Sequence, residues 1–178
     1  MLIDFRHGNA QKLANLLRGH HGPRRRAMGH RVSESGVQVY AVRNNGDQSP
    51  GAQTVTVTLD TQIHRVPDDN TVFELASSEV TIKAGGYYTF SFVVSLIASN
   101  NPRDLAGWIE EDGVEIPGSR FADSDDTPNT SAPSSVGRSF DHLVVAGKVY
   151  RVRFFTDQTG TIQGNSSNGY SRLDINRL

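Results

Sequence analysis

Apolar residues alternate with polar ones at a period of two in several short runs, and this pattern constrains the fold more than any other feature. The runs are Val37 to Ala41, Val55 to Leu59, Val80 to Ile82, Tyr88 to Leu96 and Tyr150 to Phe154. They are rich in valine, threonine and aromatic residues, and clusters of turn-forming residues separate them. No helical period of useful length occurs after Gly19. Many short strands with frequent turns predict an all-β sandwich or barrel.

The charges divide the chain into two parts. Up to Arg31 there are seven basic residues and one acidic residue, which gives a formal charge of +6. From Val32 onward eleven basic residues stand against eighteen acidic ones, which gives −7. We therefore predict a basic N-terminal arm over residues 1–36 and an acidic β domain over residues 37–178.

The arm combines a short apolar stripe with a basic strap. Asn9 is placed to cap a short helix that carries Leu13, Leu16 and Leu17 on one side, and Gly19 is placed to end it. A helix of about two or three turns is marginal alone in water, so we expect the leucines to dock on another surface. The basic residues of the extended strap that follows are Arg24, Arg25, Arg26 and Arg31.

The arginine block has three interpretations. It could neutralise phosphates, dock on an acidic protein groove, or be solvated. No aromatic residue lies between Phe5 and Tyr40, so base stacking has no support. Docking on protein is favoured over a solvated strap, and nucleic acid is the least favoured partner.

Catalytic motifs are missing from the sequence. The chain has no cysteine, which excludes a thiolate nucleophile and disulfides. It has no Gly-x-Ser-x-Gly elbow, phosphate loop, His-Glu-x-x-His motif or dinucleotide fingerprint. We expect no enzyme activity and no cofactor.

Two groups of residues raise the question of a metal, and we expect none. Asp123 to Asp126 lack the glycine and terminal glutamate of an EF-hand, and the run continues through Thr127 to Ser135 as a predicted solvated loop. The histidines of the arm have no spacing that fixes a metal geometry. His64 and His142 are interpreted as polar or half-buried strand-end residues rather than as metal ligands.

No membrane partner is expected. The longest apolar run, Phe92 to Ala98, has the length of a strand and falls far short of the roughly 20 residues of a membrane helix. The first residues, Met1 to Asp4, lack the basic start and long apolar middle of a secretory signal, so export by that route is not expected.

The strands of the body resemble a known family in order and spacing. The matching segments are Val39 to Arg43, Val72 to Leu75, Val80 to Phe92, Glu110 to Val114, Leu143 to Val152 and Tyr170 to Ile175. Together they are similar to the jelly rolls of the complement one-q head and of tumour necrosis factor. Lys148 replaces the family's usual acidic residue, and the closing strand is charged where the family is apolar. The resemblance implies a jelly-roll β-sandwich.

The strand from Tyr87 to Ile97 has apolar residues on both faces. Alternate residues from Tyr88 to Leu96 can fill the core, whereas Tyr87, Val93 and Ile97 lie on the opposite face. In the family a neighbouring subunit around a threefold axis covers that face. The resemblance therefore implies a homotrimer with Tyr87, Val93 and Ile97 at its interface. The alternative is cover by a loop of the same chain.

A jelly roll with a short basic arm, and without a collagen-like repeat, is familiar among phage structural proteins. By this analogy we expect a homotrimeric capsid decoration protein, located on the virion surface and bound through its arm to the major capsid protein or another virion protein. The alternative is a receptor- or glycan-binding tip of a fibre or spike, with the loops 100–103, 119–135 and 163–169 as contacts. A cytokine-like signalling ligand is disfavoured.

Overall fold

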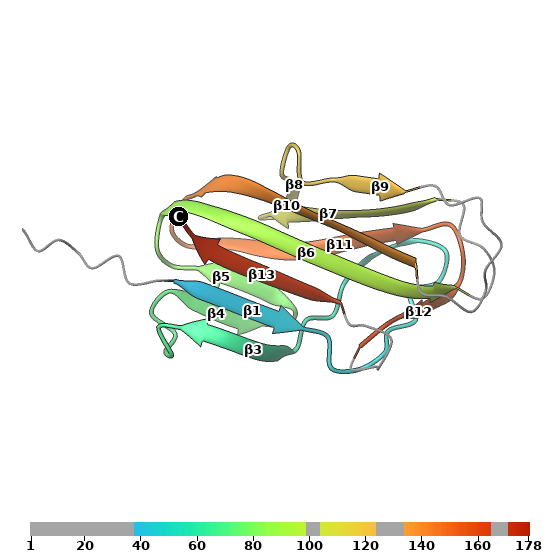
Figure 1. Ribbon diagram of the computed structural model, residues 1–178, viewed down its shortest axis with the longest axis horizontal. Helices are drawn as coiled ribbons and strands as arrows, with labels where there is room; N and C mark the ends of the chain where they lie inside the picture. The colour runs from blue at the N-terminus through green and yellow to red at the C-terminus, as the bar shows by residue number, and fades with distance from the viewer. Residues whose placement is uncertain (1–37, 99–103, 124–133, 165–170) are drawn as a thin grey trace, which may run out of the picture. The chain divides into compact units, whose positions relative to one another are not determined.

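The computed structural model describes residues 38–98, 104–123, 134–164 and 171–178, which form two antiparallel sheets (Figure 1). We call them sheet A and sheet B. Sheet A has the strand order β10-β6-β13-β1-β3, and β12 also pairs with β6. Its strands are β1 (Val39–Arg43), β3 (Thr61–Val66), β6 (Gly86–Ala98), β10 (Ser134–Val144), β12 (Gly160–Ile162) and β13 (Arg172–Arg177).

Sheet B has the strand order β4-β5-β11-β7-β8, with β2 paired to β11 and β9 paired to β7. Its strands are β2 (Thr54–Thr56), β4 (Phe73–Ala76), β5 (Glu79–Ile82), β7 (Leu105–Glu111), β8 (Val114–Glu115), β9 (Phe121–Asp123) and β11 (Lys148–Thr156). Sheet A lies in front of sheet B in Figure 1.

The core lies between the two sheets and follows from the period-two alternation. On β6 the predicted inward residues are all buried, namely Tyr88, Phe90, Phe92, Val94 and Leu96. On β11 the buried residues are Tyr150, Val152, Phe154 and Thr156. Aromatic rings fill the centre, and the ring of Phe90 lies 5.0 Å from that of Tyr150 across the sandwich. The predicted all-β sandwich is therefore confirmed.

Several predicted strand boundaries shift by one or two residues, and at two places the structure differs further from the prediction. The expected strand over Val55 to Leu59 is only β2 in the structure, because the chain then crosses from sheet B to sheet A: the amide of Val57 bonds to Val152 of β11, and the amide of Asp60 bonds to Arg43 of β1. The predicted loop through Ser135 is also too long. β10 begins at Ser134, which pairs with Leu96 of the long strand β6.

Tight turns join several of the strands. Asp112 and Gly113 both have positive φ between β7 and β8, which is the geometry of a two-residue hairpin loop. Gly147, in the turn between β10 and β11, also has positive φ, at +88°. Ser77 and Ser78 form the same kind of turn between β4 and β5 without a glycine.

The predicted short helix, the extended arm and the boundary at residue 36 lie outside the described residues. Within the described ranges, no helix is long and apolar enough to cross a membrane.

Candidate interaction surface

The outer face of sheet A carries the residues predicted for a subunit interface. Tyr87, Val93 and Ile97 all point away from the core of β6, as the alternation predicts. Tyr87 is 59% exposed, and Val93 and Ile97 are half-buried. No other described element covers this side of the strand in Figure 1. The structure therefore brings the three residues onto one open sheet face.

An apolar row crosses one end of this face. Leu143 of β10 stands opposite Tyr87 in the β10–β6 register, and the amide of Leu178 donates to the carbonyl of Tyr87 at 3.0 Å. Leu143 is 54% exposed and Leu178 is 70% exposed. Val145, in the adjoining turn, is also exposed. Exposed apolar residues in a contiguous row are typical of a contact surface.

The sequence interpretation missed Leu143 and Leu178. The family resemblance includes Leu143 without assigning it to a face, although its spacing from the buried residues Val136 and Val144 predicts that it points outward. Leu178 follows the last strand, and its proximity to Tyr87 is a matter of register between β13 and β6, which local sequence does not encode.

Small and polar residues occupy the middle of the face. Thr89 donates to Asp141 of β10 at 2.6 Å, and Ser91 stands between Ser139 of β10 and Asp174 of β13. The Asp174 side chain, opposite Ser91 of β6, is 26% exposed and therefore partly desolvated. Burial raises the pKa of Asp174, and the positive charge of Arg172 offsets this only in part.

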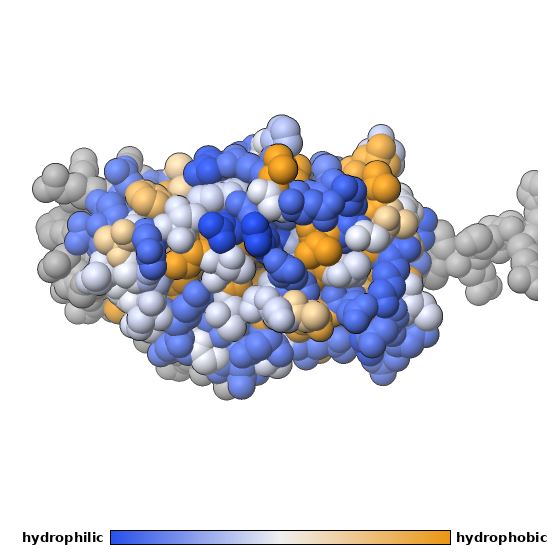
Figure 2. Space-filling view, turned by 180° about the vertical axis from the view of Figure 1, so that it is seen from behind, coloured by the Kyte–Doolittle hydropathy of each residue, from blue (hydrophilic) through white to orange (hydrophobic). Residues whose placement is uncertain are grey.

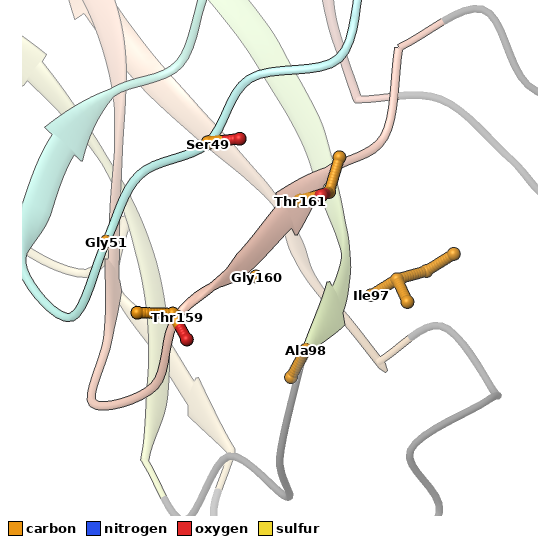
Figure 3. A pocket seen from close by; sticks show the side chains of 7 residues that line it. All are labelled: Ser49, Gly51, Ile97, Ala98, Thr159, Gly160 and Thr161. Atoms are coloured by element: carbon orange, nitrogen blue, oxygen red, sulfur yellow. The ribbon is translucent and has the colours of Figure 1, made fainter.

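The other end of the face adjoins a hollow of about 590 Å³ beside Ile97 (Figure 3). It is lined by Ser49, Gly51, Ile97, Ala98, Thr159, Gly160 and Thr161. Among the described residues, the lining contains hydroxyl and apolar groups and no charged side chain. Such a lining suits an uncharged ligand or another protein surface better than an ion.

The outer face of sheet B is different, because its charges are paired along the strands. Glu110 of β7 accepts a hydrogen bond from Arg151 at 2.6 Å and lies 3.4 Å from Nε of Arg153. The guanidinium of Arg120 stacks on the ring of Trp108 with 3.8 Å to the centroid. Figure 2 shows this side of the molecule, where hydrophilic residues predominate and apolar residues form separate small patches.

One polar cluster joins the two sheets at the sandwich edge. Glu111 of β7 accepts a hydrogen bond from the Tyr150 hydroxyl at 2.6 Å, and Nε2 of His142 lies 2.9 Å from the same carboxylate oxygen. Burial acts to raise the pKa of Glu111, but these hydrogen bonds and the nearby positive charges outweigh it and lower that pKa. The half-buried position predicted for His142 is confirmed. His64 lies exposed on β3.

Other predicted residues have no place in this surface. Asp123 ends β9 and is exposed, while Asp125 and Asp126 lie outside the described residues. So do all the arm residues named above. In the described ranges, histidine, aspartate and glutamate form no group of three that could hold a metal ion.

No family model and no curated protein matches the sequence. Solved structures do match. A crystal structure of murine APRIL has a TM-score of 0.59 and 14% identity, covering 80% of this chain and 99% of that one. The structure of Eiger TNF from S. frugiperda has a TM-score of 0.57 and 16% identity, with 80% and 92% covered. The globular domain of the zebrafish complement 1qA protein has a TM-score of 0.52 and 17% identity, with 78% and 94% covered. At such identities the likeness shows the fold, and the body of this chain is a jelly roll of the tumour-necrosis-factor and complement 1q type.

Proposed function

We propose that this chain is a non-enzymatic structural protein of a phage virion, a homotrimer that decorates the capsid surface. Its jelly roll forms the trimer, and its basic arm, residues 1–36, fixes the trimer to the major capsid protein or another virion protein. The observation that carries the proposal is the open outer face of sheet A.

The open face supports self-association for a physical reason. Tyr87, Leu143 and Leu178 each leave more than half of their surface in water, and Val93 and Ile97 extend the apolar contact along β6. Covering such side chains contributes roughly 25 cal/mol per Å² of apolar surface removed from water. The family resemblance of the sequence implies the same face as the interface and a threefold axis.

The paired charges on the outer face of sheet B indicate that this face stays in water and is not covered by another subunit. Arg151, Glu110 and Glu79 satisfy one another in the isolated subunit, so covering them would require desolvation without a new partner. A face with this chemistry is stable in water. We therefore place sheet A inward and sheet B outward in the trimer.

The arm supports attachment through its charge and its apolar stripe. Residues 1–31 carry a net charge of +6 and the chain from Val32 onward carries −7, and Leu13, Leu16 and Leu17 need an apolar partner. A virion surface that is acidic in one place and apolar in another would accommodate both.

The trimer is tested by light scattering on the purified chain at micromolar concentration. Wild-type protein is expected to have three times the monomer mass. Replacing Val93 with aspartate places a charge in the interface and is expected to yield folded monomers, because an unpaired buried charge costs several kcal/mol. Val149→Asp is the matched control, since Val149 is a half-buried valine on the outer face of sheet B. It is expected to remain trimeric. A monomeric wild-type protein would refute the homotrimer.

The arm is tested on emptied, genome-free shells. Deletion of the chain up to Arg31 is expected to leave a folded trimer that no longer binds. Replacing Arg24, Arg25 and Arg26 with alanine is expected to weaken binding and to reduce its dependence on salt, because exposed charge pairs are screened within about 8 Å at physiological ionic strength. Undiminished decoration by the truncated protein would show that the body, not the arm, is the anchor.

The hollow beside Ile97 favours a second candidate function. Its hydroxyl groups and uncharged lining suit a glycan, as expected of a receptor-binding tip on a fibre or spike. Labelled antibodies against the body, viewed on virions by electron microscopy, separate the two functions. A label spread over the shell supports decoration, and a label confined to fibre ends supports the tip.

A further inference from the structure

An acidic residue, Asp174, lies in the middle of the open face of sheet A. Asp174 lies on β13, opposite Ala41 of β1 on one side and Ser91 of β6 on the other. In the isolated subunit its side chain is already only 26% exposed. Its carboxylate lies 3.0 Å from Nε of Arg172, two residues away on the same strand.

The charged groups around Asp174 are few and come from identifiable strands. On β13 there is Arg172. On β1 the nearest charge is Arg43, which stands opposite Arg172 and so lies diagonal to Asp174. β6 presents Thr89, Ser91 and Val93 on this face and no charge. Beyond these neighbours lie His64 on β3, opposite Ala41, and Asp141 on β10, opposite Thr89.

A second copy of the chain on this face would remove water from Asp174 first and from Arg172 last. Arg172 is 47% exposed, and its long side chain can keep the guanidinium in water at the border of a contact. The aspartate side chain is short and has small residues on both sides, so it cannot reach the border. Complete burial disfavours the ionised carboxylate, which adds to the rise in pKa that partial burial already causes.

We propose that assembly of the trimer takes up a proton on Asp174, so that mildly acidic conditions strengthen the trimer and neutral conditions weaken it. This inference rests on the proposed homotrimer and names its regulation. The sign follows from linkage: a carboxyl group that holds its proton more tightly in the assembled state makes assembly more favourable as the pH falls through its pKa. Each pKa unit by which assembly raises that value changes the assembly constant about tenfold per subunit.

The test measures the concentration of half-assembly by fluorescence-detected sedimentation at pH 7.5 and pH 5. The wild-type concentration is expected to fall at least tenfold between the two conditions. Asp174→Asn has nearly the shape of the protonated residue and no charge. At pH 7.5 it is expected to assemble as tightly as wild type does at pH 5, and to lose most of the pH dependence.

Asp68→Asn is the matched control, because its side chain is 89% exposed in the turn after β3 and loses the same charge. It is expected to behave as wild type. Weaker assembly of Asp174→Asn would mean that a cation of the neighbouring subunit pairs with the carboxylate, and it would overturn the inference. So would full pH dependence retained in Asp174→Asn. A trimer with no pH dependence refutes this inference alone, whereas a wild-type monomer at every pH and concentration refutes the proposed homotrimer.

Discussion

A single glycine sets how closely the two sheets approach each other. Gly107 of β7 faces the core, and a Cβ atom there would lie 2.7 Å from Cε2 of Phe92 and 3.0 Å from Cγ2 of Val136. Both contacts are with buried side chains of sheet A that have little space to move. Gly107→Ala is therefore expected to lower the free energy of unfolding by about 1–3 kcal/mol, as measured by urea denaturation. Gly46→Ala is the control, since nothing lies within 4 Å of its added methyl group. Equal stability of the two variants would contradict the packing argument.

The Glu111 cluster predicts a pH-dependent contribution to stability. The pKa of Glu111 in the folded protein lies below the unfolded value of about 4.3. The ionised carboxylate therefore contributes to the free energy of unfolding above that pH, and this contribution is lost as the pH falls through the lowered pKa. Tyr150→Phe removes one hydrogen bond to the carboxylate and is expected to cost about 1–2 kcal/mol at pH 7. The cost is expected to shrink near pH 3, where the carboxyl takes up a proton. Urea denaturation at both pH values checks this, and a constant cost would mean that Tyr150 acts through packing alone.

The turn of the hairpin between β4 and β5 is built from two serines, which are unfavourable in its backbone conformation. Ser77 and Ser78 have φ of 51° and 68°, a region that costs a non-glycine residue roughly 1–2 kcal/mol. Asn-Gly is the preferred pair for a two-residue loop of this kind. Ser77→Asn combined with Ser78→Gly is expected to stabilise the protein by about 1 kcal/mol in thermal unfolding. Ser78→Val is expected to destabilise the protein. If the double variant and Ser78→Val both stabilised the protein, or both destabilised it, the turn geometry would be refuted.

Strands and turns differ in how well the sequence predicts them. β6 and β11 follow from alternation alone, because each buries every second residue over a long run. The Asp112–Gly113 turn follows from its glycine. The Ser77–Ser78 turn has no such signal, and the first residues of β10 resemble a loop because they are serines. They become strand only because β6 offers eleven register positions to pair with.

For the whole molecule, the fold could be predicted and the surface only in part. Order and spacing of the strands identify the jelly roll, and alternation on β6 places Tyr87, Val93 and Ile97 on one face. The row through Leu143 and Leu178 and the central position of Asp174 depend on which strands become neighbours. Such neighbours are far apart in sequence, so local patterns do not reveal them.

The place of β1 within sheet A has a mechanical consequence. β1 is an interior strand, held by β13 on one side and β3 on the other, and the chain enters it at Gln38, whose carbonyl accepts a hydrogen bond from Arg177. Inter-strand hydrogen bonds run perpendicular to the strands. A pull on the segment before Gln38, directed along β1, therefore loads the bonds to both neighbours in shear and at the same time, instead of peeling them one after another. A tether attached at this strand resists force better than one attached at an edge such as β10.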